Sequence, residues 1–312
     1  MKAVFVDANG SLAVEARRLQ RPDDLELLVN EQPDITSEQI PGVLGGAEIL
    51  IVDHTSLPVD IARQCIGLKH VVFLGTGARS YMDPEALAAI GIEVHIIKGY
   101  GDTAVAECAF ALMWASAKGF AQMDRGMRAG QWLRTDGVEL TGKTLGLIGF
   151  GGIAAEMARL ALGAGMQVLA YNRSPKAHSS VRFADLDTVL SSSEVLSIHL
   201  LLNDDTRGFI SADRIAKMRD GVILINTARG AVLDEAALVA GLKSKKIGHA
   251  GLDVFDIEPL PVNHPFTKID NVTLSAHSAF RTPEASDNLV QASLNHCRRI
   301  SGQGALVTKS GC

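Results

Sequence analysis

Short apolar runs alternate with amphipathic stretches along most of this chain. In the first hundred residues, four apolar runs predict strands at 3–8, 47–53, 69–77 and 91–97. Six more runs predict a second set of strands at 144–149, 167–171, 195–200, 221–226, 249–254 and 271–277. The segments between them have helical periodicity, including 152–165 and 234–245. This rhythm predicts an α/β protein with two parallel sheets, since the strands are too many for one compact nucleotide-binding unit.

Two further helices bear on the domain organisation. Residues 103–118 form a nearly all-apolar segment that is too short to span a bilayer, so we expect it to be buried between domains or subunits. A last helix is predicted from about Pro283, and we expect it to return to the first domain. The resulting prediction is a substrate domain at 1–100 plus 280–312 and a dinucleotide-binding domain at 101–279.

Composition excludes several classes of protein. Thirty basic and 35 acidic residues give a net charge of −5, without the basic block typical of nucleic-acid binding. No apolar run has membrane-spanning length, and the start of the chain lacks the features of a secretory signal. The cysteines show neither a CxxC pair nor a histidine at metal-ligand spacing. We therefore expect reduced thiols in a cytoplasmic protein without a metal site; the four cysteines are Cys65, Cys108, Cys297 and Cys312.

A glycine-rich turn, GFGGIA at 149–154, stands between a buried strand and a helix. In that setting Gly149 permits a tight turn, Gly151 lets a pyrophosphate approach the backbone, and Ala154 allows close packing of the helix. The helix opens at Gly152 and Ile153, where N–H groups and positive potential favour phosphate. The turn therefore predicts dinucleotide binding.

The end of the next strand bears on which dinucleotide is bound. Asn172, Arg173 and Ser174 follow the run at 167–171, and no carboxylate occurs before Asp185. An acid at this place normally binds the adenine ribose diol, whereas an arginine can pair with a 2′-phosphate. We therefore predict NADP(H) in preference to NAD(H). The alternative is that Arg173 points into solvent and NAD(H) is used.

Three side chains downstream suggest hydride-transfer chemistry: Arg229, Glu258 and His277. A histidine beside a carboxylate can move a proton, while the planar guanidinium of an arginine can hold a carboxylate substrate. Each residue alone also has an ordinary interpretation, as a helix-start arginine, a surface acid and a core histidine. Their order behind the glycine turn favours the catalytic interpretation.

Four motifs occur in succession: GKTLGLIGFGGIA, INTARGAVLDE, GLDVFDIEPLPVNHP and LSAHSAFRTPEA. From about Leu74 to Pro283 the chain resembles the D-isomer-specific 2-hydroxyacid dehydrogenase family, in particular its glyoxylate and hydroxypyruvate reductases. The resemblance implies two Rossmann-like or flavodoxin-like domains with the active site in the cleft between them. It also implies a homodimer, with 103–118 as a candidate interface.

The same resemblance assigns roles to individual residues. It implies that Arg229 binds the substrate carboxylate and the keto or hydroxyl oxygen, that His277 is the acid and base, and that Glu258 orients the histidine. The implied substrate loop is Thr76, Gly77 and Ala78. The implied cofactor contacts beyond the glycine turn are Thr103, Thr227, Ala228 and Asp253, the last through the nicotinamide carboxamide.

The chain departs from the family pattern at Asp102, Leu201, Ser278 and Phe280, which leaves the substrate open. Tyr81, Met82 and Tyr100 are further candidates for the substrate pocket. A formate-oxidising relative would have glutamine in place of Glu258, and a phosphite-oxidising one would need a basic residue such as Arg79 at the substrate loop. A corepressor or scaffold that senses NAD(P) is the alternative from another class.

Overall fold

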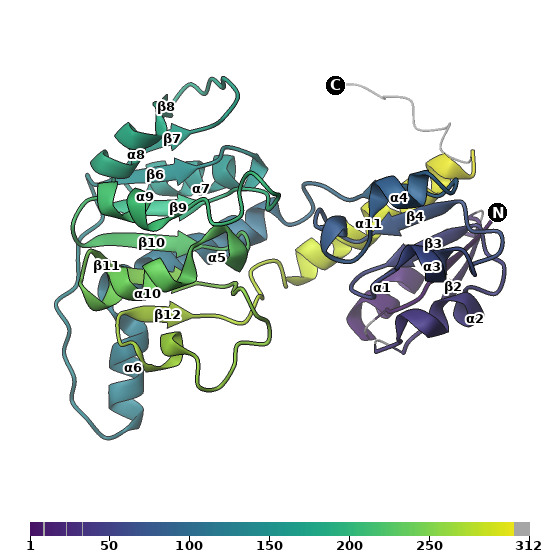
Figure 1. Cartoon of the computed structure of the whole chain (residues 1–312), viewed down its shortest axis with the longest axis horizontal. Helices are drawn as coiled ribbons and strands as arrows, with labels where there is room; N and C mark the ends of the chain where they lie inside the picture. Colours follow the sequence, from purple (N-terminus) through teal and green to yellow (C-terminus); the bar gives the residue numbers. More distant parts are fainter. Residues whose placement is uncertain (9, 23, 33, 303–312) are drawn as a thin grey trace. The chain divides into compact units, whose positions relative to one another are not determined.

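The computed structural model describes residues 1–8, 10–22, 24–32 and 34–302, so Cys312 lies outside the described residues. The chain divides into two compact units (Figure 1). Unit 1 comprises Met1–Gly101 together with the chain from Thr282 onward, and unit 2 comprises Asp102–Arg281.

Unit 1 is built on a five-stranded parallel sheet with the order β2-β1-β3-β4-β5. This is the flavodoxin-like order of a doubly wound fold. The strands are β1 (Lys2–Phe5), β2 (Glu26–Val29), β3 (Ile49–Val52), β4 (His70–Phe73) and β5 (Glu93–Ile96). The helices are α1 (Gly10–Leu19), α2 (Ile40–Leu44), α3 (Val59–Ala62), α4 (Pro84–Ala88) and α11 (Pro283–Ile300), with 3-10 turns η1 (Ser37–Gln39) and η2 (Ala78–Ser80).

Helices cover both faces of this sheet, and each face has its own apolar core. One core joins the strands to α2, α3 and α4, and the other joins them to α1 and α11. α11 is also held by a buried ion pair, in which Arg298 Nε lies 2.6 Å from Asp24 Oδ1 and each side chain is 7% exposed. The guanidinium lowers the pKa of the Asp24 carboxyl. The last helix therefore packs into unit 1 although it is distant in sequence.

Unit 2 contains a seven-stranded parallel sheet with the order β12-β11-β10-β9-β6-β7-β8. The order reverses between β6 and β9, which is the switch point of a Rossmann-type sheet. The strands are β6 (Thr144–Ile148), β7 (Gln167–Tyr171), β8 (Arg182–Phe183), β9 (Val195–Ile198), β10 (Val222–Asn226), β11 (Ile247–Leu252) and β12 (Val272–Leu274).

The helices of unit 2 also lie on both faces of its sheet. They are α5 (Asp102–Lys118), α6 (Phe120–Arg128), α7 (Gly152–Gly163), α8 (Leu186–Ser192), α9 (Ala212–Lys217) and α10 (Glu235–Lys243), with 3-10 turns η3 (Gly230–Val232) and η4 (Pro265–Lys268). α5 and α7 share one core, and α8, α9 and α10 share the other. The apolar α5 thus packs on the sheet of its own unit.

Two parallel α/β sheets confirm the predicted fold class, with differences in detail. β2 and β8 were not predicted, because β2 alternates exposed and half-buried positions and β8 has only two residues. The predicted strand at 271–277 ends at Leu274, and its last three residues belong to a loop. No helix in the described part of the chain combines the length and apolar content required to cross a bilayer.

Candidate active site

The glycine turn follows β6 at the switch point of the unit 2 sheet. Gly149 has φ of 90°, and a Cβ there would lie 2.6 Å from the carbonyl oxygen of His199, so the turn requires glycine. Gly151 is the N-cap of α7, and no atom of the described residues lies within 4 Å of the position its Cβ would take. That space allows a phosphate to approach the first N–H groups of α7.

The next two residues of this turn, Gly152 and Ile153, lie close to α5 and the core around it. Gly152 begins α7, and a Cβ at this position would overlap the carboxylate of Asp102 at the start of α5. Burial raises the pKa of Asp102, and the nearby Glu156 acts in the same direction. The sequence marked Asp102 as a departure from the family, but its contact across 50 positions is visible only in the fold. Ile153 is half-buried and packs against the core that α5 and α7 share.

The residues predicted to select the cofactor lie directly beside this turn. Asn172 Oδ1 accepts a hydrogen bond of 3.1 Å from the backbone N–H of Phe150, and its Nδ2 donates to the carbonyl of Ser174 at 2.7 Å. Arg173 is exposed, with Nη1 3.5 Å from Oδ2 of Asp205, a residue that sequence reasoning did not single out. An exposed pair at this distance holds the guanidinium weakly.

The loop after β10 carries Arg229. The amide of Asn226 accepts from the N–H of Ala228 at 3.0 Å and donates to the carbonyl of Arg229 at 2.9 Å, so the loop is bound to the strand end. The Thr227 hydroxyl is buried, and nothing in the described part of the chain forms a hydrogen bond with it. A buried polar group without a partner fits a site for a polar ligand, here the cofactor.

Close backbone contact brings this loop to the segment that carries Glu258. A Cβ on Gly230 would overlap the backbone of Phe255 and Asp256, so only glycine allows the two segments to approach. Glu258 Oε1 in turn accepts from the N–H of Phe255 at 2.8 Å. Arg229, which precedes Gly230, therefore lies next to the turn that holds the glutamate.

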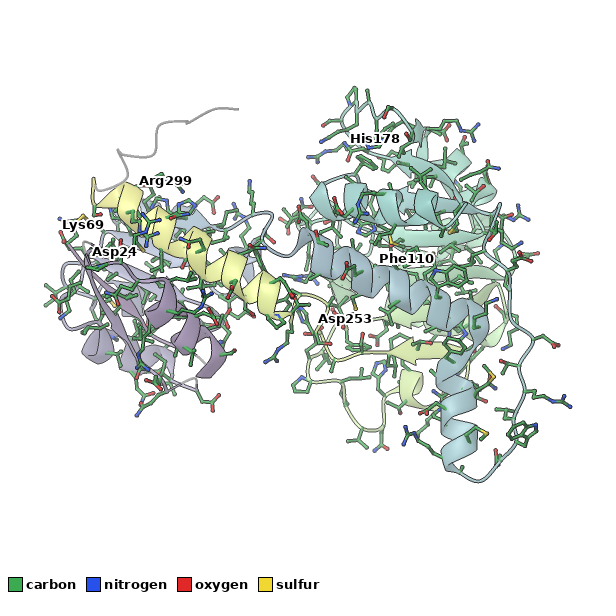
Figure 2. All side chains as sticks on the ribbon, turned by 180° about the vertical axis from the view of Figure 1, so that it is seen from behind. Asp24, Lys69, Phe110, His178, Asp253 and Arg299 are labelled. Atoms are coloured by element: carbon green, nitrogen blue, oxygen red, sulfur yellow. The ribbon has the colours of Figure 1, made fainter. Side chains whose placement is uncertain are left out.

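Asp253, which is labelled in Figure 2, follows β11. Its hydrogen bonds organise the loop that contains His277. Its carboxylate is fully buried and accepts hydrogen bonds from Ser275 Oγ at 2.6 Å and from the N–H groups of Ser278 and Ala279 at 3.0 Å. The N–H of His277 donates to the Asp253 carbonyl at 2.7 Å. These bonds hold the loop to the end of β11. The implied contact of Asp253 with the nicotinamide carboxamide stays a prediction.

His277 and Glu258 are in direct contact, with 2.5 Å between Nδ1 and Oε2. A carboxylate only accepts, so Nδ1 carries the proton and Nε2 is the nitrogen left for a substrate. His277 has φ of 45°, an uncommon conformation for a residue with a side chain and one that occurs at functional sites. Phe280 lies edge-on to the imidazole, with ring centroids 6.3 Å apart.

Five other predicted positions range from exposed to buried. Thr103 is an exposed residue near the start of α5, and Leu201 is an exposed residue in the loop after β9. In unit 1, Met82 is buried and Tyr81 packs on Phe73, which favours packing roles for both. Tyr100 packs against the other core of that unit.

The predicted substrate loop belongs to unit 1 and follows β4. Thr76 is exposed, Gly77 is half-buried and Ala78 is buried at the start of η2. The N–H groups of Thr76 and Gly77 make none of the backbone hydrogen bonds found among the described residues, so they are available to an anion. Arg79 forms an ion pair with Glu85.

The glycine turn, Arg229, Glu258 and His277 all follow strands of one parallel sheet. Since the carboxyl ends of parallel strands share an edge, a dinucleotide turn and a histidine–glutamate pair occur together there. This combination defines the class of nicotinamide-dependent oxidoreductases with a Rossmann-type unit.

Comparison with known proteins agrees with that class. Residues 110–279 match the family model of the D-isomer specific 2-hydroxyacid dehydrogenase, NAD binding domain. A hydroxypyruvate reductase from Thermotoga maritima is 37% identical over 272 residues, which cover 83% of this chain and 89% of the relative. A solved glyoxylate reductase from Paecilomyes thermophila is 28% identical with a TM-score of 0.84, covering 99% of this chain and 98% of its own. An acyclic imino acid reductase solved with NADPH and D-Arg is 26% identical with a TM-score of 0.83, covering 99% and 100%.

The chain belongs to the D-isomer specific 2-hydroxyacid dehydrogenase family, as its motifs predicted. It is accordingly an oxidoreductase with a nicotinamide cofactor. The open space over Gly151 and the unpartnered Thr227 hydroxyl are the structural features that fit this cofactor.

Proposed function

We propose that this protein reduces a small 2-keto acid, such as glyoxylate or hydroxypyruvate, to the D-2-hydroxy acid with NADPH. The observation that carries the proposal is the 2.5 Å contact between His277 Nδ1 and Glu258 Oε2, beside the loop of Arg229. The substrate class is supported by the hydroxypyruvate and glyoxylate reductases to which the chain is similar.

In this proposal the chain's own residues bind the substrate and supply the proton. Arg229 holds the substrate carboxylate, since among the described residues one of its guanidinium nitrogens is engaged, in a 2.7 Å hydrogen bond to the Ala228 carbonyl, and the others are left for a ligand. His277 transfers the proton on Nε2 to the keto oxygen while Glu258 stabilises the imidazolium. The nicotinamide cofactor, when bound, would supply a hydride to the carbonyl carbon. Unit 2 is the dinucleotide-binding domain, and unit 1 contributes the loop from Thr76 to Ala78.

Steady-state oxidation of NADPH with a panel of 2-keto acids tests the catalytic assignment. We expect His277→Asn to lower kcat by about 10²- to 10⁴-fold, the usual contribution of general acid catalysis. Asparagine is chosen because it tolerates the positive φ of this position. We expect Arg229→Ala to raise KM and lower kcat/KM, and Glu258→Gln to lower kcat.

A second histidine–glutamate pair provides the matched control. His264 Nε2 lies 2.8 Å from Glu235 Oε1, and this pair is not part of the strand-end cluster. Glu235→Gln should therefore leave kcat unchanged.

The assay also distinguishes the alternative functions. If wild type turns over none of the keto acids, the sensing or corepressor alternative is favoured. An unimpaired His277→Asn variant would exclude the proposed proton transfer. The phosphite alternative is disfavoured because Arg79 is engaged with Glu85.

The preference for NADPH is supported by Arg173 beside the glycine turn and by the NADPH-bound imino acid reductase to which the chain is similar. We expect Arg173→Ala to lower kcat/KM for NADPH by about tenfold or more and to leave NADH little changed, since a charge-assisted hydrogen bond contributes about 1.5–3 kcal/mol. Arg159→Ala on α7 is the control, because that exposed arginine pairs with Glu156. A wild-type preference for NADH would refute this part of the proposal.

The proposed assembly is a homodimer that uses α5, α6 and the segment after α6. Phe110 is half-buried on α5 (Figure 2), and the chain continues from there into a series of exposed apolar side chains. These are Phe120, Met127, Trp132, Leu133 and Val138. Exposed apolar side chains that recur along one segment favour an interaction surface, and the family resemblance favours a second copy as its partner.

A further inference from the structure

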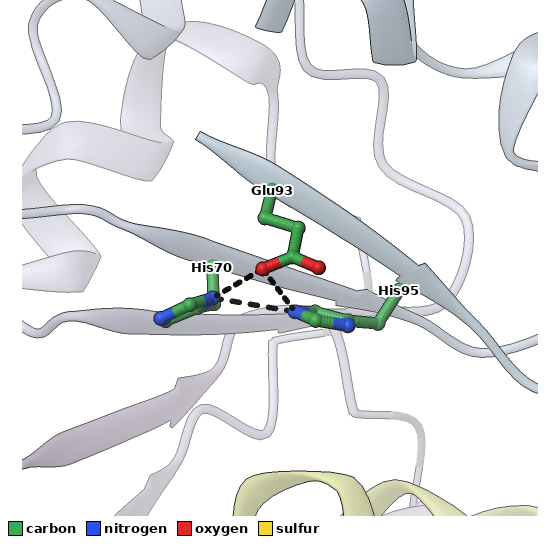
Figure 3. Close-up of side chains that lie close together, drawn as sticks. All are labelled: His70, Glu93 and His95. Carbon is green, nitrogen blue, oxygen red and sulfur yellow. Dashed lines mark hydrogen bonds and ion pairs between the residues drawn. The ribbon is translucent and has the colours of Figure 1, made fainter. Parts of the chain in front are cut away.

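Two histidines and a glutamate gather on unit 1, at the amino ends of β4 and β5. His70 is the first residue of β4, and Glu93 and His95 are the first and third residues of β5. The two strands pair in parallel with His70 opposite Glu93, and alternate residues of a strand point to the same face. The three side chains therefore converge on one side of the sheet (Figure 3).

The distances between the three possible ligand atoms are those expected between the ligands of one metal ion. His70 Nδ1 lies 3.2 Å from His95 Nε2 and 3.7 Å from Glu93 Oε2, and the last two atoms are 3.8 Å apart. A point equidistant from all three atoms lies about 2.1 Å from each, the length of a Zn–N or Zn–O bond. The cluster could therefore hold one ion with little movement of its side chains.

The residue types agree with this geometry. Imidazole nitrogen coordinates divalent transition metals, and a carboxylate adds negative charge to the site. Two side chains of α11 lie beside this cluster. The ring centroid of His296 is 5.8 Å from that of His95, and the negative charge of Glu93 partly offsets the positive charge of Arg299 at His95.

We propose that His70, Glu93 and His95 bind one divalent transition-metal ion of the Zn²⁺ type, with water completing the coordination. The site lies at the amino ends of β4 and β5, opposite the end of β4 from which the substrate loop leaves. Because β5 is an edge strand of the unit 1 sheet, the ion would tie that edge to β4. Its role is therefore to stabilise unit 1 and is independent of hydride transfer.

Titration of the metal-stripped full chain with Zn²⁺ tests the proposal, with Co²⁺ as a spectroscopic probe. We expect one Zn²⁺ bound per chain, d–d absorption typical of tetrahedral Co²⁺, and a higher unfolding temperature in the presence of Zn²⁺. His70→Gln and His95→Gln should each weaken Zn²⁺ binding by about 100-fold or more, since loss of a mere outer-shell partner already costs 10- to 100-fold.

Two further variants keep the test decisive. Glu93→Gln changes a side chain that is 68% exposed, so it should fold normally while losing both the affinity and the thermal shift. His178→Gln removes an exposed histidine outside the cluster and should bind Zn²⁺ as wild type does. Absence of stoichiometric Zn²⁺ binding by wild type, or equal binding by wild type and Glu93→Gln, would overturn the proposal.

Discussion

At the residue scale, the histidine–glutamate pair depends on one buried acid. Asp253 holds the loop of His277 through three hydrogen bonds to its carboxylate and one to its carbonyl. The family resemblance implied that Asp253 contacts the nicotinamide carboxamide of the cofactor. Its bonds to Ser275, Ser278 and Ala279 were not predictable, since they require the loop to fold back on β11.

A buried histidine of β11 predicts that the protein becomes less stable in acid. His249 is 8% exposed, and burial lowers its pKa to about 4, with smaller effects of Arg125 and Lys245. The unfolded chain has the ordinary pKa of 6.5, so it binds the proton first as the pH falls. The contribution of His249 to the free energy of unfolding is therefore complete above about pH 6.5. It is lost as the pH falls from about 6.5 to about 4, a loss on the order of 3 kcal/mol.

Denaturant unfolding at a series of pH values between about 7 and about 4 measures this effect. The free energy of unfolding should fall less steeply with acid in His249→Gln than in wild type. His178→Gln, which changes an exposed histidine, should follow the wild-type slope. Parallel slopes for wild type and His249→Gln would show that another group is responsible.

At the element scale, the turn between β6 and α7 contains one glycine that the backbone conformation requires and another that we expect the bound cofactor to require. Gly149 is required by the turn itself, whereas Gly151 has open space where a side chain would begin. We therefore expect Gly151→Ala to leave the unfolding temperature nearly unchanged and to weaken cofactor binding by about tenfold or more, because the methyl group would obstruct the pyrophosphate. Cofactor titration and thermal unfolding of the same samples test both expectations.

Gly163 at the other end of α7 provides the control for this substitution. The space around it is equally open among the described residues, so Gly163→Ala should stabilise the helix by roughly 0.5 kcal/mol and leave cofactor affinity unchanged. Equal cofactor affinity of wild type and Gly151→Ala would show that no phosphate approaches this turn.

Strand prediction succeeded where burial is complete and missed two of the four edge strands, β2 and β8. β3 and β9 are buried along their whole length; β3 is an uninterrupted apolar run, and β9 is interrupted only by Ser197. β2 is an edge strand with alternating exposure, and its few apolar residues resemble a loop. The end of β12 was placed three residues too late, because the predicted run continues past Leu274 into the loop that Asp253 holds through Ser275.

At the scale of the whole molecule, the proposed homodimer predicts a concentration-dependent mass. Light scattering coupled to gel filtration should give twice 33.1 kDa for wild type. Trp132 is 78% exposed, and Trp132→Ser should weaken the dimer by about tenfold or more, since buried tryptophans are common hot spots.

Val262→Ser serves as the matched control, because that apolar side chain is 88% exposed but lies outside α5, α6 and the segment after them. It should leave the mass unchanged. A monomeric wild type at every concentration, or equal dissociation of both variants, would contradict the proposed interface.

The sequence by itself determined the two parallel sheets, the family and the order of the motifs, because buried strands and glycine turns depend on local residue types. Only the tertiary structure decided which distant residues meet. The contact of Asp102 with Gly152, the approach of Gly230 to Phe255 and the cluster of His70 with Glu93 and His95 each join separate segments. Such contacts depend on strand order and backbone packing, which no local pattern encodes.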